Sequence, residues 1–288
     1  MDESVIPKII HQTWKSGPET LPEHWKISYD GWKSLDGWEY MYWSDDDIDI
    51  FISEHYNWFY DTFKSYAYGI QRADTFRYFV LHKYGGIYSD FDIAPKSNFE
   101  SFYELVKYED IVISRNKDGN SVGDQNLTNA FMMSKPGSKF WNHVWTYLKD
   151  PFKSHSWKKL AVHFHYFKVL FTTGPGIIND SVKSYDGEVY KIPGMFTQPG
   201  DDNTQRPFST KESVVEVLDG GSWHNNDAVF WKTAGNVYNN SFWICVSLSI
   251  LFFISTIVFL FLWLKLRRKL KNSIKRSASY NSVWGNVY

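Results

Sequence analysis

The chain has 288 residues, of which 43% are hydrophobic and 19% aromatic, and its formal net charge is −1. This length and apolar content suffice for one sizeable domain or two small ones. Seven of the 31 basic residues lie in 265–276 and no acidic residue follows position 240, so residues 1–240 carry 24 basic and 32 acidic residues, a charge of −8. An acidic body of this kind argues against nucleic acid as a partner.

Two strands and a capped helix are predicted near the N-terminus. Ile6–Trp14 is short, rich in β-branched residues and followed by a Gly-Pro turn, which favours a strand. A second strand is expected over 38–43, where aromatic residues alternate with others. Ser44 then caps a helix whose acidic first turn, 45–47, compensates the helix dipole in preference to forming a second metal site. The apolar face of this helix consists of Ile48, Phe51 and Ile52.

A long helix followed by a strand with two carboxylates is predicted next. Residues 66–84 place apolar side chains near helical spacing, and the glycines that follow end the helix. In the strand expected over 87–93, Asp90 and Asp92 should point to one side, because side chains alternate along an extended chain. Further strands are expected at 111–114, 129–134 and 214–218, and a helix at 140–148.

This alternation of strands and helices predicts an α/β domain with a mostly parallel sheet flanked by helices. Ligands of such sheets bind beyond the carboxyl ends of the strands, where Asp90 and Asp92 are expected. Two hard oxygen ligands on one side describe a site for Mg²⁺ or Mn²⁺. Such a metal commonly neutralises a diphosphate leaving group. The alternative is a pair of solvated turn acids.

Two further pairs of residues accompany this motif. Asp74 and Arg77 are three residues apart on the predicted helix and share a face, and the alternative to a functional pair is a surface ion pair that contributes little. Gly85 and Gly86 lack side chains beside the predicted metal, so that the backbone there can approach a ligand closely. Plain capping of the helix is the alternative for the two glycines.

A membrane segment is predicted at Phe242–Leu264, which is 23 residues long and contains no charge. That length spans a hydrocarbon core of ~30 Å, and Trp243 and Trp263 lie near its ends as in an aromatic belt. A buried soluble helix is the alternative. The basic cluster that follows places the C-terminal tail in the cytosol and the rest of the chain in a lumen.

The topology stays open at the sequence level. The N-terminus has neither a basic nor an apolar signal region, so either the C-terminal anchor directs translocation, or an upstream segment is missing, or the domain faces the cytosol. The one cysteine, Cys245, lies in the predicted membrane segment, which excludes a disulfide in the folded domain. Glycosylation sequons begin at Asn126, Asn179 and Asn239.

Five motifs in order carry a family resemblance: Ile6–Trp14 (IPKIIHQTW), Arg72–Pro95 (RADTFRYFVLHKYGGIYSDFDIAP), Asn129–Phe140 (NAFMMSKPGSKF), Thr173–Gly176 (TGPG) and Gly221–His224 (GSWH). Together they resemble the DXD-containing glycosyltransferases related to the yeast initiating α-1,6-mannosyltransferase and to the catalytic subunits of mannosyl-inositol-phosphoceramide synthase. A lone DXD is weak, but its spacing from the A-D-x-x-R-Y motif is specific. The N-terminal anchor usual in this family is absent here.

The resemblance implies a GT-A-like fold, retention of anomeric configuration and a role for each matching residue. Asp92 is expected to bind the metal directly, and Asp90 the ribose or the metal through water. Asp74 would hold sugar or ribose hydroxyls and Arg77 the donor. Trp14 would stack on the nucleotide base, with a core position as the alternative. The further implied donor-side residues are Gln12, His11, Arg72, Tyr88 and Asn129. The expected third metal ligand is His224, with Asp227 as the alternative, and Gly174 and Pro175 would shape the acceptor side.

The function implied is a metal-dependent glycosyltransferase with GDP-mannose as donor and inositol phosphoceramide as acceptor. Protein N- or O-glycans are the alternative acceptors. A non-catalytic nucleotide-sugar binder and a phosphohydrolase are less favoured. The expected organisation is a catalytic domain over 1–240, a transmembrane helix over 241–265 and a basic cytosolic tail over 266–288. The expected location is a Golgi or ER membrane with the domain in the lumen. A small regulatory subunit is a possible partner, and the aromatic stretch 164–167, with Trp231 and Tyr238, a possible membrane-facing surface.

Overall fold

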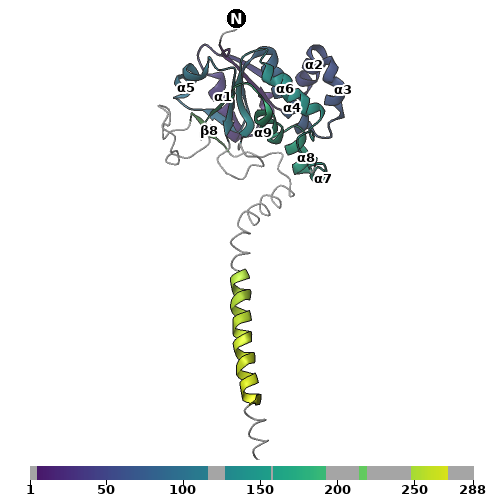
Figure 1. The fold of residues 1–288 in the computed structure, drawn as a ribbon. Helices are drawn as coiled ribbons and strands as arrows, with labels where there is room; N and C mark the ends of the chain where they lie inside the picture. Colours follow the sequence, from purple (N-terminus) through teal and green to yellow (C-terminus); the bar gives the residue numbers. More distant parts are fainter. Residues whose placement is uncertain (1–4, 116–126, 157, 193–213, 219–247, 272–288) are drawn as a thin grey trace, which may run out of the picture. The chain divides into compact units, whose positions relative to one another are not determined.

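The chain is described here from a computed structural model that covers residues 5–115, 127–156, 158–192, 214–218 and 248–271. It divides into two compact units, 1–230 and 231–288. The first unit holds the predicted α/β domain, and the second holds a single described helix (Figure 1).

A six-stranded mixed sheet organises the first unit, with the strand order β2-β1-β3-β6-β5-β7. Three of its five pairings are parallel and the two that involve β6 are antiparallel. The mostly parallel sheet predicted from the sequence is therefore confirmed. A second, two-stranded sheet pairs β4 with β8. The strands are β1 (Ile9–Thr13), β2 (Glu39–Trp43), β3 (Gly86–Ser89), β4 (Ile93–Pro95), β5 (Ile111–Arg115), β6 (Leu127–Ser134), β7 (Tyr190–Ile192) and β8 (Val215–Val217).

Helices cover both faces of this sheet (Figure 1). Successive residues of β3, Ile87 and Tyr88, enter two different apolar clusters, because strand side chains alternate between faces. The Tyr88 face packs against α2, α3, α4, α6 and α9, and the Ile87 face against α1 and α5. The helices are α1 (Glu23–Lys33), α2 (Asp45–His55), α3 (Asn57–Ser65), α4 (Gly69–Tyr84), α5 (Phe99–Val106), α6 (Lys139–Lys149), α7 (Lys158–Ala161), α8 (His165–Thr172) and α9 (Pro175–Ser184), with a 3-10 turn η1 at Pro18–Thr20.

The predicted start of α2 is confirmed in detail. The Ser44 hydroxyl accepts from the backbone N–H of Asp47, and the Asp47 carboxylate accepts from the backbone N–H of Ser44. This reciprocal capping box satisfies donors that a helix leaves free at its first turn. The predicted apolar face of α2, made of Ile48, Phe51 and Ile52, is buried.

The carboxylate motif does not lie on a strand, and the prediction of an extended stretch over 87–93 is wrong at this point. β3 ends at Ser89, and a turn follows in which the N–H of Ile93 donates to the Asp90 carbonyl over 3.1 Å. The chain leaves the six-stranded sheet here because β4 pairs with β8 in the second sheet. A turn, and not strand alternation, therefore orients Asp90 and Asp92.

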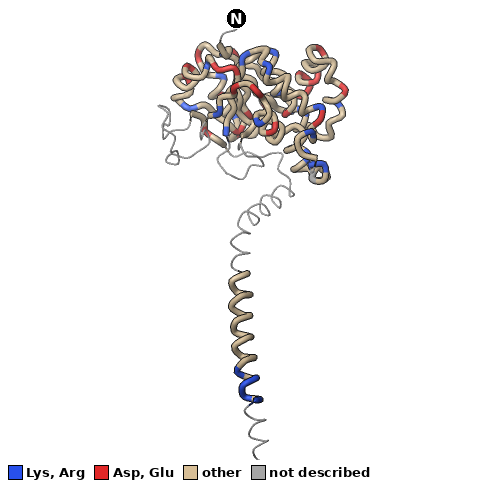
Figure 2. The backbone as a smooth tube through the Cα atoms, viewed as in Figure 1, with Lys and Arg blue, Asp and Glu red and all other residues tan. Residues whose placement is uncertain are grey.

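The second unit contains a helix, Leu248–Lys271, that is long and apolar enough to cross a membrane. It has 24 residues and a mean hydropathy of 2.3, and none of its apolar window is buried inside the chain. The alternative of a buried soluble helix is therefore not supported for these residues. Lys and Arg gather at its C-terminal end (Figure 2). The helix is a candidate single membrane span.

Candidate active site

A cavity of about 480 Å³ opens at one edge of the six-stranded sheet. Because β1 and β3 run parallel, the residues that follow them, Trp14 and Asp90, meet at the same edge. β6 runs antiparallel and contributes Asn129 from near its start, and the first half of α4 supplies the adjoining wall. The lining residues are Thr13, Trp14, Lys15, Trp25, Asp45, Tyr68, Gly69, Ile70, Ala73, Asp74, Arg77, Asp90, Phe91, Asp92, Asn129, His165 and Pro175.

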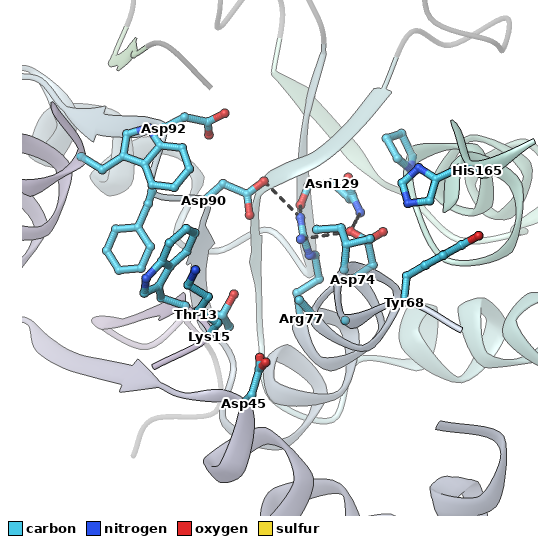
Figure 3. A pocket seen from close by; sticks show the side chains of 17 residues that line it. Thr13, Lys15, Asp45, Tyr68, Asp74, Arg77, Asp90, Asp92, Asn129 and His165 are labelled. Atoms are coloured by element: carbon cyan, nitrogen blue, oxygen red, sulfur yellow. Dashed lines mark hydrogen bonds and ion pairs between the residues drawn. The ribbon is translucent and has the colours of Figure 1, made fainter. Parts of the chain in front are cut away.

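Arg77 connects the α4 motif to the carboxylate motif at the centre of the cavity (Figure 3). Its Nη2 lies 3.0 Å from Asp74 Oδ1, and its Nη1 lies 3.3 Å from Asp90 Oδ2. The same Nη1 donates to the Asn129 carbonyl over 2.8 Å. The Arg77 side chain is only 3% exposed, so this is not the weak surface ion pair that the sequence left open.

Asp74 accepts hydrogen bonds from three different elements. Besides the contact with Arg77, its Oδ1 accepts from Asn129 Nδ2 over 2.9 Å and its Oδ2 from Thr173 Oγ1 over 3.2 Å. Burial raises the pKa of Asp74 to about 6, against the opposing effect of the Arg77 charge. One donor on α4, one on β6 and one just before α9 thus hold the buried Asp74 carboxylate at the cavity wall.

Asp90 is positioned by residues that lie behind the cavity. The Tyr88 hydroxyl donates to Asp90 Oδ1 over 2.9 Å and accepts from Thr13 Oγ1. The Tyr88 ring lies 4.5 Å below the Arg77 guanidinium, which adds a cation–π contact. Gln12 donates to the Asp90 carbonyl over 3.4 Å while its own carbonyl accepts from Tyr40. Tyr88 and Gln12 do not line the cavity, and each acts on it through Asp90.

The surroundings of the Asp92 carboxylate suit a metal ligand. Its Oδ1 is buried and has no hydrogen-bond partner among the described residues. Burial, and then the neighbouring Asp90 charge, raise the pKa of Asp92 to about 7. A divalent cation would satisfy the free oxygen and offset the repulsion between the two carboxylates. The described residues therefore fit Mg²⁺ or Mn²⁺ as two carboxylate ligands, and among them no set of three His, Cys, Asp or Glu gathers.

An aromatic wall flanks the carboxylate motif. Trp14 and Trp25 both line the cavity and pack edge to face, with ring centroids 5.2 Å apart. Trp14 Nε1 donates to Thr20 Oγ1 over 3.1 Å, which fixes the orientation of the ring. Trp14 is half-buried against a small apolar cluster, and the Lys15 ammonium lies 5.4 Å from its ring centroid.

Several predicted site residues lie elsewhere. Gly85 caps the end of α4 and Gly86 begins β3, at the end of the strand remote from Asp90, with φ of 66° and 89°. A Cβ on Gly86 would lie 2.4 Å from the Ile9 carbonyl, so close strand packing and helix capping account for these glycines. Arg72 donates to the Tyr66 carbonyl and does not line the cavity. His11 is fully buried behind it. Pro175 lines the cavity, Gly174 caps α9 beside Asp74, and His224 and Asp227 lie outside the described residues.

Sequence reasoning missed part of the cavity wall. Lys15, Asp45, Tyr68 and His165 line it, and none of the four was predicted as a site residue: Asp45 was assigned to a helix-capping turn, Tyr68 to the helix over 66–84, and His165 to a possible membrane-facing stretch. Tyr68 and His165 contact each other edge to face, with ring centroids 4.3 Å apart. They are 97 positions apart in the sequence, and the signal that could have found them is the aromatic and His-rich stretch after position 162.

A mostly parallel α/β sheet with paired carboxylates after an inner strand defines the class of GT-A-like domains with a DXD motif. Residues 22–116 match the family described as "Glycosyltransferase sugar-binding region containing DXD motif". This range includes Asp74, Arg77, Asp90 and Asp92, so the resemblance seen in the sequence is confirmed.

The chain is similar to enzymes of sphingolipid mannosylation. It is 31% identical over 239 residues to inositol phosphoceramide mannosyltransferase 2 of Schizosaccharomyces pombe, covering 82% of this chain and 64% of that protein. It is 32% identical to mannosyl phosphorylinositol ceramide synthase CSH1 of Saccharomyces cerevisiae, covering 81% and 56%. Inositol phosphoceramide mannosyltransferase 1 of S. pombe is 29% identical, with 96% and 79% covered. The chain spans only 64% and 56% of the length of the first two of these relatives.

Among solved structures, the PaToxG glycosyltransferase matches with a TM-score of 0.42 and 17% identity, over 67% of this chain and 72% of that one.

Proposed function

We propose that this chain is a metal-dependent, retaining glycosyltransferase that transfers mannose from GDP-mannose to inositol phosphoceramide. The observation that carries the proposal is the meeting of two motifs at one cavity: Arg77 lies between Asp74 and Asp90, and Asp92 presents a buried free oxygen beside them. The names of the similar proteins supply the sugar and the lipid.

Asp90 and Asp92 are the residues that would hold Mn²⁺ or Mg²⁺, with His224 or Asp227 as the proposed third ligand. When bound, the metal supplies positive charge that stabilises a departing nucleoside diphosphate. Arg77 already places a fixed cation beside Asp90, and its low exposure keeps that charge poorly screened. The Arg77 guanidinium is thus proposed to supply positive charge to the diphosphate beside the metal ligands.

The sugar is proposed to lie against Asp74 and Asn129. The Asp74 carboxylate accepts from Arg77, Asn129 and Thr173, and its position on the cavity wall allows it to accept from a sugar hydroxyl as well. Because these donors come from three elements, the carboxylate is held rigidly, which favours one orientation of the sugar. The Trp14 ring is the proposed platform for the guanine base.

We propose that no side chain other than the metal ligands acts as an essential general base. Asp74 already accepts from Arg77, Asn129 and Thr173, and Asp90 accepts from both Tyr88 and Arg77. We therefore propose front-face displacement, in which the leaving phosphate accepts the acceptor proton and the configuration is retained. The anomeric C–O bond to the phosphate breaks as the bond to the acceptor oxygen forms.

A membrane lipid is the favoured acceptor because the same chain carries the candidate span Leu248–Lys271. We propose that the span is a single-pass anchor in a Golgi or ER membrane and that the domain faces the lumen. A small regulatory subunit remains part of the proposal. Protein N- or O-glycans are the second candidate acceptors, favoured by the 26% identity to the initiation-specific α-1,6-mannosyltransferase of Candida albicans.

The test uses purified full-length protein in detergent with Mn²⁺, a panel of nucleotide sugars and two acceptors. Mannosyl transfer from GDP-mannose to inositol phosphoceramide supports the proposal, and transfer only to a high-mannose glycan supports the second candidate. Release of free mannose without transfer to either acceptor would overturn both. Asp92→Asn, which keeps the side-chain volume, is the matched inactive control.

A further inference from the structure

Helices α7 and α8 present an unusual surface on the first unit. Leu160 on α7 is 78% exposed, and Phe164, immediately before α8, is 46% exposed. Leu160 is the most exposed large apolar side chain among the described residues, the candidate span included. His163 lies between them in sequence and is exposed too. We call Leu160, His163 and Phe164 the α7–α8 surface.

This surface rests on a firmly packed base. Lys158 of α7 is only 5% exposed and forms a buried ion pair with Asp180 of α9. Its ammonium also lies 5.1 Å from the Phe171 ring centroid on α8. Val169, Leu170 and Phe171 of α8 are buried. The outward position of Leu160 and Phe164 is therefore imposed by packing on the opposite side of the same two short helices.

The charge around the α7–α8 surface is opposite to that of the domain. Residues 149–168 contain five Lys and three His against a single acid, Asp150, whereas residues 1–240 carry −8 overall. Lys153 and Lys159 are exposed, and blue residues gather around α7 (Figure 2). A surface that combines exposed apolar side chains with exposed lysines is suited to bind the headgroup region of an anionic bilayer.

The same element reaches the cavity. His165, the first residue of α8, lines the cavity opposite the carboxylate motif and contacts Tyr68 (Figure 3). Its Nδ1 is buried and has no hydrogen-bond partner among the described residues. The exposed Phe164 and the wall residue His165 are therefore consecutive in the chain. A surface that entered a bilayer at Phe164 would bring this wall to the lipid–water boundary.

We propose that the α7–α8 surface docks on the headgroup region of an anionic membrane and that the acceptor lipid enters the cavity past Tyr68 and His165. The inference rests on the proposed lipid acceptor and adds to it the face through which the lipid arrives. Leu160 and Phe164 enter the acyl boundary, and Lys153 and Lys159 contact lipid phosphates.

Depth measurement tests the docking without using activity. Cys245→Ser removes the one native cysteine, and a spin label is then placed by Leu160→Cys or Phe164→Cys in the full chain. Leu105→Cys is the matched control, because Leu105 is 45% exposed on α5, on the other side of the domain (Figure 1). Accessibility to oxygen and to a water-soluble nickel complex is measured in vesicles of phosphatidylcholine with phosphatidylserine.

The expected result is membrane depth at positions 160 and 164 and water exposure at position 105. Water exposure at all three positions would overturn the docking surface. Spin–spin coupling between labels at position 160 of two chains, without membrane depth, would show instead that a second copy covers this face. Vesicles of phosphatidylcholine alone should reduce the depth signal, because they lack the negative charge that Lys153 and Lys159 are proposed to contact.

Kinetics separate this inference from the proposed function. The double variant Leu160→Gln, Phe164→Gln should raise the KM for vesicle-borne inositol phosphoceramide about tenfold, which corresponds to about 1.4 kcal/mol. Its KM for a short-chain, water-soluble analogue should not change. An equal change with both acceptors would contradict a docking role. A wild-type protein that shows membrane depth yet transfers to neither acceptor would instead overturn the proposed function alone.

Discussion

Arg77 Nη1 lies 3.3 Å from Asp90 Oδ2, and this contact joins the α4 motif to the carboxylate motif. The guanidinium is planar and carries five donors, so it reaches Asp74, Asp90 and the Asn129 carbonyl at once. A point charge at the same position cannot make these three contacts. The geometry of the cavity centre therefore depends on the shape of one side chain as well as on its charge.

Arg77→Lys should lower the transfer rate by roughly 10²-fold and the free energy of unfolding by about 2–3 kcal/mol, because buried partners lose their donors. Arg77→Met, which removes the charge entirely, should cost more in both measurements. Initial rates and urea unfolding check the two effects. Lys83→Met, on the same helix but outside the cavity, serves as the control. Near-normal transfer by Arg77→Lys would show that charge alone suffices.

Asp92→Asn should stabilise the metal-free protein at pH 8 and remove its response to metal. The pKa of Asp92 is raised to about 7, so the folded state disfavours the carboxylate that the unfolded state carries freely above about pH 4. Removing the charge should add about 1–3 kcal/mol to the free energy of unfolding at pH 8. At pH 3, where both states are protonated, the gain should vanish.

Thermal unfolding with and without Mn²⁺ completes this test. Metal at about 100 times its Kd should stabilise the wild type by about 3 kcal/mol and leave Asp92→Asn unchanged. Equal stabilisation of both proteins would exclude Asp92 as a ligand.

Protonation of His11 should destabilise the fold below neutral pH. His11 Nε2 donates to the Gly85 carbonyl over 3.0 Å, and its Nδ1 accepts from Trp43 Nε1 over 3.2 Å, so both nitrogens are engaged in the neutral ring. Burial lowers the pKa of His11 to about 4. The unfolded state takes up a proton below about pH 6.5 and the folded state only near pH 4, so about 3 kcal/mol should be lost across this window.

His11→Gln isolates this contribution, because glutamine offers one donor and one acceptor but does not titrate. As the pH falls from 7 to 4, the free energy of unfolding of the wild type should decrease relative to that of His11→Gln. Below pH 4 the difference between the two proteins should stay constant. Parallel curves over the whole range would contradict the assignment of a neutral, structural His11.

Asn179 should carry no glycan in the folded protein, although its sequon suits a lumenal domain. Its side chain is 5% exposed and bonds both backbone groups of Leu127 at the start of β6. Asn179→Asp removes the donor and should cost about 1–3 kcal/mol of stability. Mass spectrometry of peptides from secretory-pathway protein, with urea unfolding of the variant, measures both. A glycosylated and fully folded Asn179 would contradict this packing.

The local patterns predicted the secondary structure around the site well. The capping box at Ser44 and the end of α4 before Gly85 are local hydrogen-bond and φ requirements, so neighbouring residues determine them. The turn at Asp90 was missed because it depends on the pairing of β4 with β8, about 120 residues apart, which no local pattern encodes.

The sequence by itself determined that two acidic motifs, a strand-and-helix alternation and a 23-residue uncharged segment occur in one chain. Periodicity and composition act over a few residues, and they suffice for such features. Only the tertiary structure decided which residues meet: it brought Asn129 and Thr173 to Asp74, put Gly86 against Ile9 and away from the cavity, and set Tyr68 beside His165. These contacts join positions 55 to 99 residues apart, and the packing of helices on the sheet fixes them.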